Sequence, residues 1–143
     1  MGTPDRSNVG FLIRLIYDAL GRQLDENLKP MNLTHSQALV IAFLKTREGI
    51  PTSITDIRNE LKVSAPTALG LVQRLEKKGF ARTYTDKDDH RIRLVFLNSD
   101  QMLHVDRSFQ DAVNMEEKML EGLSSEERER LADYLNRVYQ NIR

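Results

Sequence analysis

Two short stretches near the middle of the chain carry side chains suited to contacts with a nucleic acid. Residues 64–67 (Ser-Ala-Pro-Thr) begin a segment with helical periodicity, and hydroxyl and free backbone N–H groups at the start of a helix can face phosphates and base edges. Residues 86–91 (Asp-Lys-Asp-Asp-His-Arg) form a polar turn between two strand-like segments, and their basic side chains could reach phosphates. Both stretches are suited to binding a nucleic acid through noncovalent contacts, and neither points to a covalent reaction.

Several of these residues also have a plain structural interpretation. Ser64 is either the N-cap of its helix or a phosphate contact, and the two roles can coexist. Arg74 is either a phosphate contact or one half of a surface ion pair. The three acids at 86, 88 and 89 would repel phosphate unless they are turned away or paired.

The sequence offers no group of residues for catalysis or metal binding. Its three histidines, at 35, 90 and 104, are far apart, and it has no HExxH motif, Gly-rich phosphate loop or nucleophile motif. The absence of cysteine excludes disulfides, thiolate zinc sites and thiol redox sensors. We therefore expect a binding protein without cofactor or metal, not an enzyme.

The segments around the two stretches predict a winged helix-turn-helix between residues 53 and 97. A short helix capped by Ser53 or Thr52 and a longer one starting at Ser64 are expected, the second ending at Gly79. Residues 80–85 and 92–97 have strand composition and predict a two-stranded hairpin, the wing. This layout places one helix in the major groove of DNA and the hairpin beside it.

Helical periodicity continues on both sides of this winged helix-turn-helix, which we call the reader. Thr34 with Gln37, and Ser124 with Glu127, have the spacing of a capping box and predict two helix starts. The helix predicted over residues 9–28 spans about 30 Å, which is hard to bury on so small a module. We therefore expect the terminal helices to pack together and against a second copy of the chain. The expected dimer contacts are Leu12, Ile16, Val113, Leu131, Leu135, Val138 and Ile142.

The charge is unevenly distributed although the net charge is 0. Residues 58–105 carry nine Lys and Arg against six Asp and Glu, and residues 106–143 carry six against nine. A basic excess on the reader favours DNA as the partner, although differences of this size also arise by chance. No segment approaches the ~20 consecutive apolar residues of a membrane-spanning helix, and the polar start lacks a secretory signal. These features suit a cytoplasmic protein.

Several motifs, in this order and spacing, resemble the MarR (multiple antibiotic resistance regulator) family of winged-helix regulators. The resemblance runs from about residue 9 to residue 140. The stretches that carry it are Leu33-Thr-His-Ser-Gln37, Leu61-Lys-Val-Ser64 with Thr67, Leu75-Glu-Lys-Lys-Gly-Phe80 with Arg82, Asp86-Lys-Asp-Asp-His-Arg91 with Val95-Phe-Leu-Asn98, and Leu123-Ser-Ser-Glu-Glu-Arg128.

The resemblance implies a homodimer that binds a near-palindromic operator and is released by a small anionic or lipophilic effector, in a pocket between the dimer base and the reader. It implies that Asp89 orients the wing tip while Arg91 enters the minor groove, the alternative being a solvated turn charge. The chain departs from the family pattern at Leu69 and Gly70. Leu69 could contact a thymine methyl and Gly70 could permit close backbone approach, or the helix reads less sequence.

The predicted fold is mainly helical, with about six helices and one hairpin wing. The expected organisation is a dimerisation helix in residues 1–32, the DNA-binding lobe in 33–98 and dimerisation helices in 99–143. The predicted function is a DNA-binding transcriptional regulator, more specifically a repressor. The alternative is a winged-helix module for protein interaction. The predicted DNA contacts are Ser64, Ala65, Thr67, Leu69, Gly70, Arg74, Lys87, Asp89, His90 and Arg91.

Overall fold

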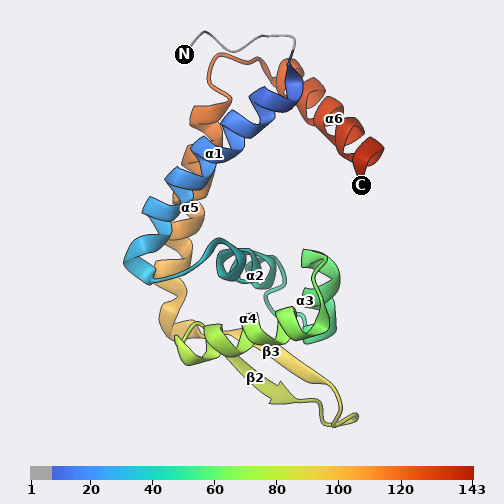
Figure 1. Cartoon of the computed structure of the whole chain (residues 1–143). Coiled ribbons are helices and arrows are strands. Elements are labelled where there is room, and N and C mark those ends of the chain that lie inside the picture. Colours follow the sequence, from blue (N-terminus) through green and yellow to red (C-terminus); the bar gives the residue numbers. More distant parts are fainter. Residues whose placement is uncertain (1–7) are drawn as a thin grey trace. The chain divides into compact units, whose positions relative to one another are not determined.

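The computed structural model describes residues 8–143, so the first seven residues of the predicted N-terminal segment lie outside the described part. Within that part, the chain forms six α-helices and a small three-stranded sheet (Figure 1), and the sequence divides after Phe109 into two compact units. The elements are α1 (Val9–Leu28), η1 (Lys29–Met31), α2 (His35–Thr46), β1 (Thr52–Ser53), α3 (Ile54–Leu61), α4 (Ala65–Lys77), β2 (Ala81–Thr85), β3 (Arg93–Leu97), η2 (Ser99–Gln101), α5 (Met102–Met119) and α6 (Ser125–Ile142).

Hydroxyl caps begin the helices where the sequence predicts them. At α2, Thr34 Oγ1 accepts a hydrogen bond from the Gln37 backbone N–H at 3.2 Å, and Gln37 Oε1 accepts from the Thr34 N–H. Ser53 caps α3 in the same way, and so does Ser124 at α6. Each cap satisfies an otherwise unpaired backbone donor and contributes about 1 kcal/mol. The capping-box predictions are therefore confirmed.

Gly79 ends α4 and turns the chain into the wing. Its φ of +84° is costly for a residue with a Cβ, and it lets the Phe80 N–H donate to the Leu75 carbonyl at 2.9 Å. Asn98, which follows β3, donates from its side chain to the Gly79 carbonyl at 2.9 Å. The end of α4 is thus joined to both strands of the hairpin. The predicted helix end at Gly79 is confirmed.

The wing sheet has three strands, so the predicted two-stranded hairpin is incomplete. The strand order is β1-β3-β2, all antiparallel, and Thr52 of β1 pairs with Val95 of β3. β1 has only two residues, too few for the alternation by which a strand is recognised in a sequence. Its pairing depends on a tertiary contact, which periodicity does not reveal.

The core lies between α2, α3, α4 and the sheet, all within the first unit. α4 contributes four buried residues spaced three or four apart, which places one face of the helix against the core. Fully burying a large apolar side chain contributes about 1.5–3 kcal/mol. The core residues are Val40, Ile41, Leu44, Ile57, Ala68, Leu71, Val72, Leu75, Phe80, Ala81, Val95 and Val105.

The second unit contains the end of α5 and the whole of α6. Arg128 holds the turn between them: its guanidinium lies 3.1 Å from a Glu117 oxygen and donates to the carbonyls of Leu120 and Leu123. The backbone N–H of Ser124, with its hydroxyl, holds the pKa of Glu127 below its ordinary value. No residue of α6 is buried, and none of the described helices is long and apolar enough to cross a bilayer.

Candidate nucleic-acid interface

The start of α4 presents an exposed hydroxyl pair. Ser64 Oγ accepts from the Thr67 backbone N–H at 3.2 Å and donates to Thr67 Oγ1 at 2.9 Å, so Ser64 is the N-cap. With its own proton committed to Thr67, Ser64 leaves the Thr67 hydroxyl to donate outward. Ala65 is exposed in the same turn, and Pro66 has no N–H to offer. The donors at this helix end are therefore few and well defined.

Further along α4, Gly70 makes room for Arg74. A Cβ built at Gly70 would lie 3.2 Å from Arg74 Nη1, so the guanidinium extends back along the helix over the glycine. Arg74 is exposed and forms no ion pair within the described part of the chain, which leaves its charge available to an anion. Leu69, like Gly70, is half-buried. This packing gives Gly70 a local role that its departure from the family pattern did not suggest.

A compact loop closes the wing between β2 and β3. Asp86 Oδ1 accepts from the backbone N–H groups of Asp88 and Asp89, at 2.8 and 3.1 Å, and the Ile92 N–H donates to the Asp89 carbonyl at 3.0 Å. These bonds hold the tip in one conformation. They also turn the Asp86 carboxylate toward the loop backbone, which reduces the repulsion that this acid would exert on a phosphate.

Asp89 and Arg91 form a two-pronged ion pair at the tip. Asp89 Oδ1 lies 3.0 Å from Arg91 Nε and Oδ2 lies 3.1 Å from Nη2, while Oδ1 also accepts the Arg91 backbone N–H. The Arg91 side chain lowers the pKa of Asp89, and Asp89 raises the pKa of Arg91. The Arg91 side chain is 91% exposed, so the carboxylate orients the guanidinium without covering it. Lys87 and His90 are exposed on the same loop.

The predicted contact residues therefore form two groups. In Figure 1, the N-terminus of α4 and the tip of the β2–β3 hairpin lie toward the same side of the lobe. The α4 group is Ser64, Ala65, Thr67, Leu69, Gly70 and Arg74, and the tip group is Lys87, Asp89, His90 and Arg91.

Three residues that the sequence did not single out link α4 to the wing. Glu76 Oε2 accepts from the Thr83 backbone N–H at 3.0 Å and from Thr83 Oγ1 at 2.7 Å. Arg93 Nη2 donates to the same Thr83 hydroxyl at 2.9 Å. Strand alternation places Thr83 and Arg93 on one face of the hairpin once the register is known, but the register itself comes from the fold.

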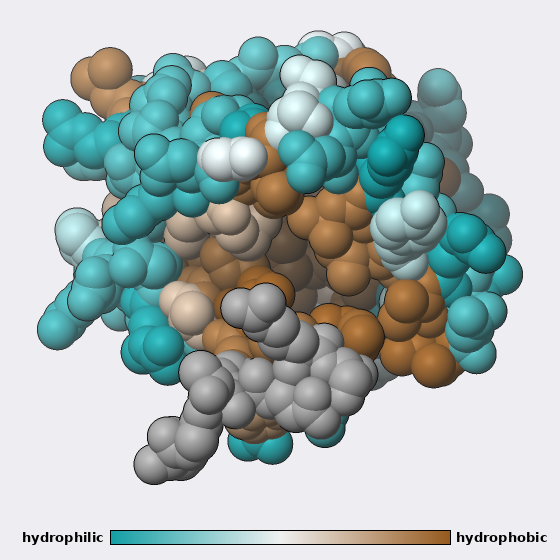
Figure 2. All heavy atoms as spheres, turned by 90° about the horizontal axis from the view of Figure 1, so that it is seen from above, coloured by the Kyte–Doolittle hydropathy of each residue, from teal (hydrophilic) through white to brown (hydrophobic). Residues whose placement is uncertain are grey.

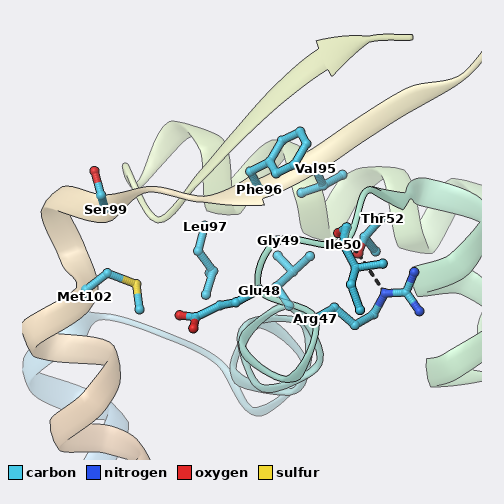
Figure 3. A pocket seen from close by; sticks show the side chains of 11 residues that line it. Arg47, Glu48, Gly49, Ile50, Thr52, Val95, Phe96, Leu97, Ser99 and Met102 are labelled. Atoms are coloured by element: carbon cyan, nitrogen blue, oxygen red, sulfur yellow. Dashed lines mark hydrogen bonds between the residues drawn. The ribbon is translucent and has the colours of Figure 1, made fainter.

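A cavity of about 230 Å³ lies beside β3, between the end of α2 and the start of α5 (Figure 3). Its wall is mixed: Leu97 and Met102 supply apolar surface, and the Glu48 side chain points toward them. Arg47 is directed away, because its Nε donates to Thr52 Oγ1 at 2.9 Å. Lys45 holds Glu48 at 3.0 Å and Asp106 at 2.9 Å, and Asp106 is the main cause of its raised pKa. The cavity has room for a small molecule that carries both apolar and polar groups.

The predicted dimer contacts are mostly solvent-exposed in the single chain. Ile16, Val113 and Ile142 are more than half exposed, and Leu12 is half-buried. In Figure 2, hydrophobic side chains (brown) are visible at the surface among hydrophilic ones (teal). The remaining predicted contacts are also exposed, at 36% for Leu131, 47% for Leu135 and 37% for Val138.

Comparison with known proteins supports the predicted fold and the resemblance to the MarR family. Residues 31–92 match the model of the MarR family. An uncharacterised HTH-type transcriptional regulator of Bacillus subtilis, YybA, is 26% identical over 130 residues, which cover 91% of this chain and 85% of that protein. The resemblance inferred from the sequence is therefore confirmed.

Solved structures with the same fold include DNA-binding regulators. The S. aureus MepR–DNA complex superposes with a TM-score of 0.85 at 22% identity, covering 95% of this chain and 97% of that one. The transcriptional regulator SlyA gives 0.80 at 25% identity, covering 94% of each chain. BpsR of Bordetella bronchiseptica, whose DNA binding is regulated by 6-hydroxynicotinic acid, gives 0.77 at 23% identity, covering 96% and 98%. These likenesses confirm the predicted winged helix-turn-helix.

Proposed function

From the match of residues 31–92 to the MarR family model, we propose that the chain is a transcriptional repressor of this family that binds a near-palindromic operator as a homodimer and is released by a small-molecule effector. The observation that carries the DNA-binding part is the wing tip. There Asp89 orients a guanidinium that stays almost fully exposed on a loop held by backbone hydrogen bonds. A guanidinium presented in this way fits a narrow minor groove, whose negative potential is strongest over A·T pairs.

The recognition helix has a smaller part in direct reading. Thr67 supplies a hydroxyl for a base edge or phosphate, Leu69 an apolar contact for a thymine methyl, and Arg74 a charge for a phosphate. Ser64 acts mainly as the cap that places Thr67. The other proposed contacts to the DNA backbone are Ala65, Gly70, Lys87 and His90.

Dimerisation supplies the second reader. The exposed apolar residues of α1, α5 and α6 would be buried against a second copy, and a two-fold axis would then repeat the reader on the DNA. Two recognition helices would enter successive major grooves about 34 Å apart. This spacing is why we propose a near-palindromic operator.

Effector control is supported by a relative and by a cavity. DNA binding by BpsR, a protein of the same fold, is regulated by 6-hydroxynicotinic acid. In this chain, the cavity beside β3 could take a small lipophilic or aromatic molecule, and an occupant there would press on the strand that leads from the wing tip. We propose that such a molecule weakens DNA binding by moving the wing.

A salt titration of binding to mixed genomic DNA tests the proposal. The logarithm of the binding constant should fall linearly with the logarithm of salt concentration, with a slope of roughly −0.9 for each phosphate neutralised. A slope near zero would refute DNA binding and favour the winged-helix protein-interaction module instead. Selecting the genomic fragments that bind most tightly would then reveal the operator and its half-site spacing.

A further inference from the structure

We propose that Arg93, at the start of β3, contacts a DNA phosphate in the notch between the recognition helix and the wing, where Thr83 and Glu76 hold it in position. The inference rests on the proposed DNA-binding function and adds to it a contact that neither the sequence motifs nor the wing-tip pair provides. The notch is defined by three side chains: Glu76 in the last turn of α4, Thr83 in β2 and Arg93 in β3.

The donor and the acceptor of each hydrogen bond in the notch can be assigned in only one way. A guanidinium only donates, so Thr83 Oγ1 accepts from Arg93 Nη2 at 2.9 Å. The single proton of that hydroxyl is then free for Glu76 Oε2, which lies 2.7 Å away and also accepts the Thr83 backbone N–H. Glu76 thereby fixes the hydroxyl, and the hydroxyl fixes one edge of the Arg93 guanidinium.

The position of the notch follows from how a winged helix binds DNA. With α4 in a major groove and the wing tip in the adjacent minor groove, the sugar-phosphate strand that separates the two grooves must pass between α4 and the wing. Thr83 faces α4, since it bonds Glu76, and Arg93 lies on the same face of the hairpin. An arginine on this face meets the strand that lies between the grooves.

Arg93 keeps its charge available. It is exposed, and within residues 8–143 it has no carboxylate at ion-pair distance, whereas Arg91 is paired with Asp89 and Arg82 lies 3.8 Å from Asp100. Its bond to a neutral hydroxyl orients the guanidinium without neutralising it, and the remaining N–H groups can donate to phosphate oxygens. Glu76 lies close to the same hydroxyl, and its hydrogen-bonded oxygen is already occupied by Thr83.

The test compares Arg93→Gln with the unmodified chain on labelled duplexes of roughly 30 base pairs, three helical turns, of mixed, A·T-rich and G·C-rich sequence. The salt slope should become shallower by about 0.9 for each lost phosphate contact, hence by about 1.8 for a dimer. Affinity at fixed salt should fall about tenfold, equally on A·T-rich and G·C-rich duplexes, because phosphate contacts carry no sequence information. Arg107→Gln, an exposed arginine on α5, removes the same charge elsewhere and should leave the slope unchanged.

Two further variants separate charge from positioning. Arg93→Lys keeps the charge and should retain the slope with a weaker affinity, and Thr83→Val removes the hydroxyl and should weaken binding about threefold with the slope retained. Thermal unfolding of each variant checks that the fold is intact. An unchanged slope in folded Arg93→Gln would overturn the phosphate contact, and unchanged affinity in Thr83→Val would overturn the positioning role. A flat salt dependence in the unmodified chain would instead refute the proposed function itself.

Discussion

The winged lobe and the last helix differ sharply in what they bury. Every residue of the main core lies between Val40 and Val105, whereas α6 has no buried residue and exposes Leu135 at 47%. Both regions are equally well specified locally, since α2, α3 and α6 all begin with capping boxes and α4 begins with a serine cap. Local signals such as caps are enough to form a helix in both regions. An apolar stripe that stays exposed in the single chain predicts that the helix associates with another surface.

The first prediction tests whether α6 lacks a partner in the single chain. Leu135→Asn should disrupt the proposed dimer, because burying an unpaired amide costs about 1–3 kcal/mol and a two-fold interface contains it twice. Sedimentation velocity at several concentrations measures the change. Asp133→Asn, on the opposite side of α6 at two residues from Leu135, should leave the association unchanged. An intact dimer in the Asn variant would contradict our interface.

The second prediction tests whether the buried core of the winged lobe stabilises the fold more than its exposed apolar residues do. Leu75 is fully buried, so Leu75→Ala should lower the free energy of unfolding by about 2–5 kcal/mol. Urea denaturation followed by circular dichroism measures the loss. Leu103→Ala, at a side chain that is 85% exposed, should change stability by no more than about 0.5 kcal/mol. Equal effects at the two positions would remove the distinction between core and exposed apolar residues.

The third prediction concerns the wing tip, the part of the lobe that faces outward. Arg91→Ala should weaken operator binding by about 1–3 kcal/mol and reduce the preference for A·T-rich flanks. Asp89→Ala should weaken it less, because the guanidinium remains but loses its orientation. Fluorescence anisotropy at fixed salt measures both. Unchanged affinity in Arg91→Ala would refute the minor-groove role.

The tip should also respond to acid in a defined direction. The pKa of Asp89 is lowered by Arg91, so the ion pair contributes stability above the ordinary aspartate range and loses it as pH falls through the lowered value. At neutral pH the Asp89 carboxylate is therefore ionised and able to pair with Arg91. NMR of the Arg91 side-chain Nε–H during an acid titration should show release below the ordinary range, and release at neutral pH would contradict the pairing.

The smallest effect is expected at Gly70. Replacing a glycine inside a helix with alanine raises stability by about 0.5–1 kcal/mol, but here the new Cβ would lie 3.2 Å from Arg74 Nη1 and displace that guanidinium. Gly70→Ala should thus be more stable and bind DNA slightly less well. Thermal unfolding and anisotropy together measure the two changes. Tighter DNA binding would contradict the role of Gly70 in placing Arg74.

Features that depend on a few neighbouring residues could be predicted from the sequence. The caps at Thr34 and Ser124 and the helix end at Gly79 are of this kind, since each needs groups within about four positions. The strand at Thr52 and the contact of Thr83 with Glu76 could not, because they join segments brought together by the fold. The roles of Asp89 and Arg91 came from the family resemblance, and their observed pairing is consistent with those roles.

One measurement addresses the central claim, which is that two winged helix-turn-helix lobes bind DNA together because the terminal helices of two chains dimerise. Hydroxyl-radical footprinting of the full chain, on the genomic fragment it binds most tightly, reports every protected position along both strands. We predict two protected half-sites whose centres are about one helical turn apart, roughly 34 Å, with protection of the adjoining minor grooves by Arg91. A single protected half-site, or protection without two-fold symmetry, would contradict the account.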